Sequence, residues 1–334
     1  MRRVGAKPKQ RGVALIIALV LVALATILAT KLSFDGFLEL RRTTGVMAAE
    51  QALHFGLGAE ALAADVLVQD AQTSGGTTTL AGPWAQPTQP LPITPENNPE
   101  GEPIGTLQGA LEDMQGRFNL NSLARMGADG VTRDPLPLQQ FQRLLASVDV
   151  EERWAGLVRD WIDQDDVVST PDGAKDAVYT SQSPPYRTGN WPMMSPSELM
   201  NLPGFGADRY RKIAPYVAAL PSANLSINVC TAPALVLESL VQGLSGEWSN
   251  SPAVLTNARK TGCFPDVNTF THVANSSNLK AMASKGSNIE MKSSYFQLTT
   301  RVRLGTTEFT LYSLLFRADT GGKVSPLLRS FGTP

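Results

Sequence analysis

The densest group of acidic residues in the chain is the stretch DWIDQDDVVSTPDGAKDAVY, which runs from residue 160 to residue 179. Carboxylates this close repel one another unless a hard cation gathers them, and Ca²⁺ takes about 6 to 8 oxygen ligands from flexible loops. Asp160 lies one helical turn earlier, on a predicted helix end, and is left out of the ligand set. We predict one or more Ca²⁺ sites whose oxygens come mainly from Asp163, Asp165, Asp166, Asp172 and Asp176.

The spacing of these acids leaves alternatives open. An EF-hand loop needs glycine and glutamate at set positions, and this stretch lacks that pattern. A solvated acidic loop, turned by Pro171 and Gly173, fits the spacing as well as a metal site does. A carboxylate hydrolase that uses the acids from Asp163 to Asp176 is a remote third interpretation.

Few other residues are suited to catalysis. The two histidines, His54 and His272, lie away from any strand-turn nucleophile motif. The Cys-x-x-Cys and His-Glu-x-x-His spacings, typical of redox and zinc sites, are also missing from the sequence. We therefore predict that the protein is not an enzyme.

The elements that must position these residues begin with an apolar N-terminal segment. No charged residue lies between Arg11 and Lys31, which leaves about the 20 residues that a helix needs to cross a bilayer. The segment ahead of it is basic and contains no acid. This bias keeps the N-terminus in the cytoplasm and sends the rest of the chain across the membrane.

Gly12 stands between the last basic residue and the first apolar one, so cleavage after it would leave a whole helix that starts at Val13. This layout resembles the signal of type IV pilins and pseudopilins, in which a prepilin peptidase cuts after glycine and methylates the new amine. Ordinary signal-peptide cleavage and an uncleaved anchor are the alternatives, although ATILATKL is a poor small-residue cleavage site.

One residue departs from that signal. Its fifth mature residue is usually glutamate, which is thought to neutralise the amine of a neighbouring subunit, whereas this chain has Ile17. A lone charge in apolar surroundings costs several kcal/mol, on the order given by transfer data. A subunit without this carboxylate can join such a pairing on one side only, and we therefore predict a position at the filament end. The alternative is that Ile17 is one more lipid-facing residue and that bulk sets the position.

Export also bears on the two cysteines, Cys230 and Cys263. Cysteines that can meet in an oxidising compartment usually pair. We predict a disulfide, which stabilises the fold by about 3 to 4 kcal/mol on the chain-entropy model; two buried thiols are the alternative.

No nucleic-acid partner is expected. The formal charge of −1 becomes more negative when the basic leader is lost, so bulk charge would not attract nucleic acid. The LPGFG turn at residues 202–206 resembles a helix-hairpin-helix turn, but we interpret its glycines as the ends of packed helices.

Periodicity organises the rest of the chain. Apolar residues at three- and four-residue steps continue the N-terminal helix out of the membrane: Phe34, Leu38, Met47, Leu53, Leu57 and Leu62. Seven prolines make residues 73–103 a long loop. Strand patterns follow at 105–123, about a Gln115-Gly116 turn, and at 293–317, as a hairpin turned at Gly305. Helices are predicted between these strand regions, at 136–148, 151–161, 195–201, 207–219 and 232–243.

Five segments, in this order, resemble the general secretion pathway protein K family of type II secretion minor pseudopilins: RGVALIIALVLVALATILAT, EDMQGRFNLNSL, DWIDQDD, SPSELMNLPGFG and INVCTAPALVLESL. The resemblance implies an α+β, pilin-like fold, in which a long N-terminal helix packs on an antiparallel sheet, with a large α-helical insertion that binds Ca²⁺. Two residues depart from the family pattern. Cys230 stands where the family often has asparagine, and Lys175, which cannot be a ligand, stands where it often has glutamate.

The resemblance also implies an organisation and a setting. The expected parts are a prepilin leader (1–12), a transmembrane segment (13–34), the first part of the head (35–121), the helical insertion (122–285) and the last strands (286–334). The expected place is the tip of a periplasmic pseudopilus on the bacterial inner membrane, where the protein helps to start assembly and to export folded proteins across the outer membrane. The expected partners are the other minor pseudopilins, the major pseudopilin, prepilin peptidase, the inner-membrane secretion platform and secreted substrates. A minor pilin of a type IV pilus is the alternative.

Overall fold

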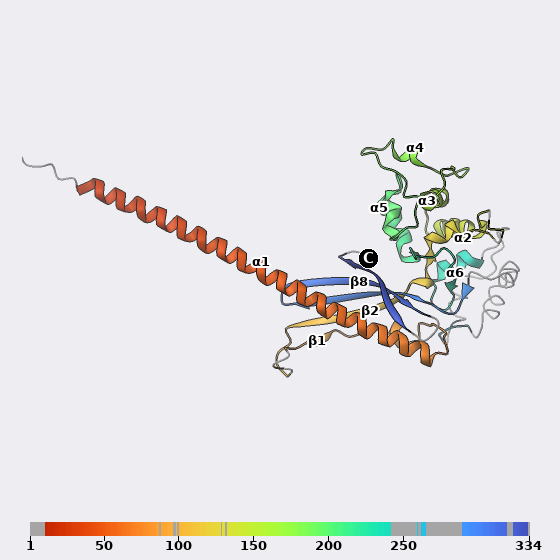
Figure 1. Ribbon diagram of the computed structural model, residues 1–334, viewed down its shortest axis with the longest axis horizontal. Coiled ribbons are helices and arrows are strands. Elements are labelled where there is room, and N and C mark those ends of the chain that lie inside the picture. The colour runs from red at the N-terminus through yellow and green to blue at the C-terminus, as the bar shows by residue number, and fades with distance from the viewer. Residues whose placement is uncertain are drawn as a thin grey trace, which may run out of the picture.

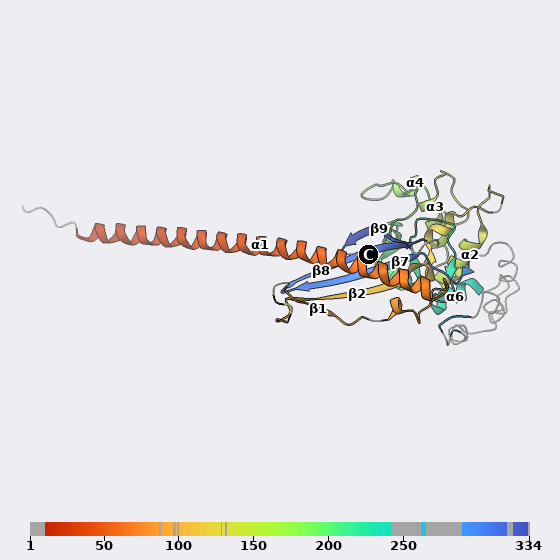
Figure 2. The same cartoon turned by 60° about the horizontal axis from the view of Figure 1, so that its bottom comes forward.

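A single long helix and a compact head make up the computed structural model. It describes residues 11–86, 88–95, 98, 100–127, 129, 130, 132–241, 259, 262–264, 289–318 and 323–332. Helix α1 spans Arg11–Thr73 without a break. Figures 1 and 2 show its N-terminal half projecting alone, while its C-terminal half lies against the sheet of the head.

The head sheet has five antiparallel strands in the order β1-β2-β7-β8-β9. Their bounds are Leu91–Ile93 for β1, Gly105–Asp113 for β2, Tyr295–Leu304 for β7, Thr307–Arg317 for β8 and Val324–Phe331 for β9. Strands β7 and β8 form the predicted hairpin, in which Gly305 takes a positive φ of 55° that suits glycine. The proline-rich segment contributes one 3₁₀ turn, η1 at Pro83–Ala85, and the edge strand β1, where proline is tolerated.

The predicted faces of β7 are confirmed. Its residues alternate between the core and the outer side of the sheet, and Arg301 and Arg303 are exposed. The core-facing set is buried: Phe296, Leu298, Thr300, Val302 and Leu304. Two groups of buried apolar residues between this face and α1 form the core of the head.

The face of α1 that meets the sheet was predicted wrongly in part. Leu62 is 59% exposed, and the helix instead buries the small residues Ala52, Gly56, Ala59 and Ala63 together with Leu67. Small residues let the helix backbone approach the sheet closely: a Cβ on Gly56 would lie 3.2 Å from Cδ2 of Leu311. Counting large apolar residues selected the wrong stripe because α1 carries such residues on more than one face.

The helical block lies between β2 and β7 in sequence. Within the described residues, its α-helices are α2 (Pro135–Ser147), α3 (Trp154–Ile162), α4 (Asp176–Tyr179), α5 (Gly206–Ile213) and α6 (Ala234–Val241). Its 3₁₀ helices are η3 (Leu120–Ala124), η4 (Pro196–Asn201) and η5 (Ala214–Tyr216). The predicted helix at 207–219 is shorter than expected, because Pro215 lacks the N–H that would continue it, and the chain then enters strand β4 (Val217–Ala218).

The block has its own apolar core, which includes the stacked rings of Phe118 and Phe141 and the edge-to-face pair Trp154 and Phe205. The chain leaves β2 through a 3₁₀ turn, η2 at Met114–Gly116. Two short parallel pairings then tie the ends of the block to its interior. Strand β3 (Phe118–Asn119) pairs with β4, and β5 (Ile227–Asn228) pairs with β6 (Ile289–Glu290). Figures 1 and 2 place the block at the end of the head farthest from the projecting half of α1.

Candidate functional site

The N-terminal end of α1 is the first candidate site. Val13 and Ile17 lie in its opening turns and are 61% and 54% exposed. The helix is long and apolar enough to cross a membrane, with a mean hydropathy of 2.9 over its most apolar window. Thr26 and Thr30 donate their hydroxyls to backbone oxygens 2.8 Å away, so these groups are satisfied without water. These features fit a single membrane anchor that carries a C-terminal domain.

The acidic loop after α3 is the second candidate. Asp163 accepts a hydrogen bond from the guanidinium of Arg133, which also lies 3.8 Å from Oδ2 of Asp165. Asp176 accepts from the backbone N–H and the hydroxyl of Thr188, at 3.0 and 2.7 Å, and these bonds hold its pKa below the ordinary value. Asp163 and Asp176 are therefore engaged by donors of the chain itself.

These placements do not assemble the predicted ligand set. Within the part of the chain that the structure describes, no three or more acidic, histidine or cysteine side chains are grouped closely enough to hold a metal ion. Asp166 and Asp172, the remaining predicted ligands, are not brought into such a group either. Lys175, which stands inside the loop, is only 6% exposed. Calcium binding stays a prediction.

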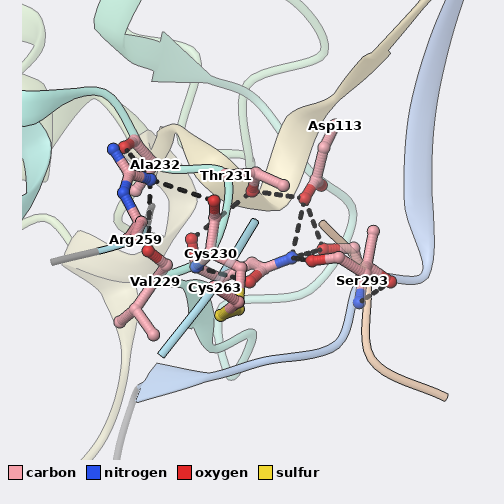
Figure 3. The surroundings of a disulfide bond; sticks show 10 residues. Asp113, Val229, Cys230, Thr231, Ala232, Arg259, Cys263 and Ser293 are labelled. Atoms are coloured by element: carbon pink, nitrogen blue, oxygen red, sulfur yellow. Dashed lines mark hydrogen bonds between the residues drawn. A yellow bond between two sulfur atoms is a disulfide. The ribbon is translucent and has the colours of Figure 1, made fainter. Parts of the chain in front are cut away.

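The third candidate is the junction between head and helical block, shown in Figure 3. Cys230 and Cys263 form the predicted disulfide there, with their Cα atoms 4.7 Å apart. Arg259 donates to the carbonyl oxygens of Val229, Cys230 and Ala232 at 3.3, 3.0 and 2.9 Å, so its guanidinium fastens the segment beside the disulfide. Cys230 is buried and its backbone N–H donates to Oδ1 of Asn228.

Asp113, at the end of β2, lies at the centre of this junction (Figure 3). Its Oδ2 accepts from the hydroxyls of Thr231 and Ser293 at 2.6 Å each and from the Asn228 amide at 3.0 Å, while Oδ1 accepts from the backbone N–H of Gln115. Burial raises the pKa of Asp113, and these hydrogen bonds partly offset that rise. One carboxylate thus joins the sheet, the helical block and the start of β7.

Sequence reasoning missed Asp113, although it belongs to the quoted segment EDMQGRFNLNSL. The same segment contributes Asn119 and Asn121, whose buried amides bond Ser222 O at 2.7 Å and Met193 O at 2.9 Å. The sequence did contain a signal for these residues, because the polar residues of this segment interrupt an apolar pattern typical of a strand. Buried polar groups need partners, and these partners lie far away in the sequence.

Two ion pairs, also missed, hold α1 to the sheet. Arg329 of β9 donates to both carboxylate oxygens of Glu60 at 2.9 and 2.7 Å. Arg317 of β8 lies 3.2 Å from Asp70, and both side chains are almost fully buried. These contacts position the C-terminal half of α1 on the head.

Among the described residues, few are arranged in a way that resembles a catalytic site. His54 is exposed on α1, and His272 lies outside the described residues. An open recess of about 800 Å³ is lined by residues of α5 and of the segment ahead of α3, not by the predicted aspartates. Arg209 and Lys212 at this recess pair with Glu151 and Asp149, in keeping with packed helices at the LPGFG turn.

Known proteins resemble this chain over most of its length. Type II secretion system protein K of Aeromonas hydrophila is 33% identical over 321 residues, which cover 92% of this chain and 93% of that protein. The protein of the same name from Pseudomonas aeruginosa is 34% identical and covers 97% of this chain and 93% of its own length. The chain belongs to the type II secretion system protein K family.

Further comparisons agree with this assignment. The family description "Type II secretion system (T2SS), protein K" matches residues 116–222, within the helical block and its entry. The crystal structure of the GspK-GspI-GspJ complex of enterotoxigenic Escherichia coli superposes with a TM-score of 0.74 at 28% identity. The match covers 88% of this chain and 100% of the matched chain of that complex. The protein is thus a minor pseudopilin with the predicted α+β fold. Proteins of this family are structural components of the secretion machinery.

Proposed function

We propose that this minor pseudopilin sits at the tip of a periplasmic pseudopilus, where it helps to start assembly and to export folded proteins across the outer membrane. The observation that carries the proposal is the place of the helical block, at the end of the head farthest from the projecting half of α1. In a filament of parallel α1 helices, this block would occupy the space where the next head should stack. Growth would then proceed only beneath this subunit.

The partners follow from the same geometry. The structural neighbour was solved as a complex of GspK with GspI and GspJ. For this chain we propose the other minor pseudopilins as direct neighbours and the major pseudopilin below them. The exposed apolar half of α1 would pack among their anchors. Cross-linking of the full chain in membranes tests this: adducts with minor pseudopilins at a fixed, low stoichiometry support the tip position, and ladders of this chain with itself contradict it.

Processing would precede assembly. We propose that prepilin peptidase cleaves between Gly12 and Val13 and methylates the amine of Val13, leaving α1 in the inner membrane and the head in the periplasm. The absence of charge along the following span supports an intact anchor after this cut. Intact mass and N-terminal sequence of the membrane-extracted protein test it. An N-terminus at Met1, or one beyond Thr30, would contradict the proposal.

A further inference from the structure

The ammonium of Lys175 lies inside the acidic loop, surrounded by oxygen atoms. Its Nζ donates to the backbone oxygens of Asp160 and Asp163 at 2.8 and 2.9 Å and to Oδ1 of Asn190 at 3.2 Å. The ammonium has three donor hydrogens, and these three acceptors use all of them.

The acceptors belong to a place that needs a cation. Asp160 lies in the last turn of α3 and Asp163 is its C-cap, so their carbonyl oxygens are among those that a helix leaves without an intrahelical partner. The C-terminal end of a helix also carries a partial negative charge, which a cation stabilises. Lys175 supplies both the charge and the missing donors.

The neighbouring carboxylates show why a divalent ion fits poorly here. The side chain of Asp163 is taken by Arg133, and Oδ2 of Asp160 accepts from the backbone N–H of Ser169 at 3.0 Å. Oδ1 of Asp160 is buried without a hydrogen-bond partner, but one such oxygen is far short of the 6 to 8 or so that Ca²⁺ takes. A divalent cation beside the Lys175 ammonium would also be repelled by it.

We propose that Lys175 is a built-in cation that takes the place of a bound metal ion in the helical block, so that the folding of this block does not depend on Ca²⁺. The chain's own ammonium gathers the carbonyl oxygens of the loop, and Arg133 neutralises the adjacent acid. The acidic loop is held by covalently attached charges that a chelator cannot remove.

Thermal unfolding of the full chain in detergent, followed by tryptophan fluorescence, tests the proposal. Trp154 and Trp161, in α3, report on the helical block. The melting temperature of the wild-type protein should be the same in EDTA and in excess Ca²⁺. A melting temperature that falls in EDTA and recovers with Ca²⁺ would overturn the proposal, since a ligand that binds only the folded state must stabilise it.

Two substitutions test the role of the ammonium itself. Lys175→Met keeps the length of the side chain but removes the donors, and should lower the melting temperature by about 3 to 10 °C with or without Ca²⁺. Lys175→Glu should have a lower melting temperature than wild type in EDTA, and added Ca²⁺ should raise it again. In this variant the new carboxylate and the oxygens that the ammonium no longer binds, those of Asp160, Asp163 and Asn190, can surround a metal ion. A Lys175→Glu protein that melts in EDTA at the wild-type temperature would overturn the proposal.

Lys212→Met is the matched control. Lys212 also donates to a backbone oxygen and to a carboxylate, both of Asp149, but its side chain is 46% exposed. Exposed ion pairs contribute little to stability, so this variant should melt close to wild type. An equal fall in melting temperature in both lysine variants would overturn the proposal, because Lys175 would then act as an ordinary surface charge.

Discussion

At the scale of single residues, the structure depends on a few buried polar groups that connect distant parts of the chain. Asp113 is the clearest case, because one carboxylate accepts from Gln115, Asn228, Thr231 and Ser293. A buried polar group costs free energy unless it is hydrogen-bonded. Removal of the carboxylate would leave several donors without an acceptor at the junction of head and helical block.

The buried position of Asp113 predicts a pH effect. Burial raises its pKa above the ordinary value of 3.8, so the folded protein keeps this proton at pH values where the unfolded chain has released it. Asp113 therefore contributes stability that is fully present below its unfolded pKa and is lost as pH rises through the folded pKa. The difference in unfolding free energy between wild type and Asp113→Asn should therefore fall as pH rises above the ordinary pKa of an aspartate, about 4.

Chemical denaturation at several pH values measures this difference. Asp208→Asn, at an exposed side chain of α5, is the control for the substitution itself and should change the unfolding free energy little. A difference between wild type and Asp113→Asn that stays constant over the range would contradict the interpretation of Asp113 as a buried, proton-retaining group.

At the scale of elements, α1 is one continuous helix whose two halves lie in different surroundings. Its N-terminal half is exposed and apolar, and its C-terminal half buries small residues against β7 and β8. Two leucines of the same helix differ sharply, since Leu67 is fully buried and Leu62 is 59% exposed.

These leucines make a matched pair of variants. Leu67→Ala should lower the unfolding free energy by about 2 to 5 kcal/mol, because it removes buried apolar contacts and leaves a cavity. Leu62→Ala, on the exposed side, should change it by no more than about 0.5 kcal/mol. Denaturant titration of both variants measures the two effects. A larger loss at Leu62 would mean that the helix packs on the face first predicted from periodicity.

The disulfide joins the segment after β5 to residues near Arg259, so its removal should lower the stability of the helical block. Replacing Cys230 and Cys263 together by serine should cost about 3 to 4 kcal/mol on the chain-entropy model. Thermal unfolding with and without a reductant checks this: the reductant should destabilise wild type and leave the double variant unchanged. Equal stability of the oxidised wild type and the double variant would contradict it.

At the scale of the whole molecule, position in a filament has two candidate causes. One is the helical block, whose bulk lies beyond the sheet (Figure 1). The other is Ile17, which provides no carboxylate for pairing with a neighbour's amine in apolar surroundings. The two causes act at opposite ends of the molecule and can be separated by one substitution.

Ile17→Glu is that substitution. If charge pairing sets the position, the variant should enter the filament shaft or change filament length, whereas position set by bulk should leave its copy number and place unchanged. Immunogold labelling of sheared filaments and quantitative blotting distinguish the two. A variant that is not processed after Gly12 would show its leader by mass, so intact mass is the control for each preparation.

The sequence alone determined the features that depend on neighbouring residues. The apolar anchor, the β7–β8 hairpin and the loop before β2 follow from periodicity, charge and proline content over short stretches. Two cysteines leave one possible intramolecular pair, and the five quoted segments were enough to indicate the family. In each case the interactions that decide the structure are between residues close in sequence, or, as for the cysteines, only one pairing is possible.

Only the tertiary structure decided which polar groups meet across long separations. Asp113 and Ser293 are joined through the fold, as are Glu60 and Arg329, and no local pattern pairs them. The acidic loop makes the same point, because the spacing of its aspartates did not indicate that Arg133 would bind Asp163 or that the Lys175 ammonium would bind the backbone oxygen of Asp160. Charge partners are selected by three-dimensional proximity and by the need to satisfy buried groups, and neither is encoded in the spacing of the acids themselves.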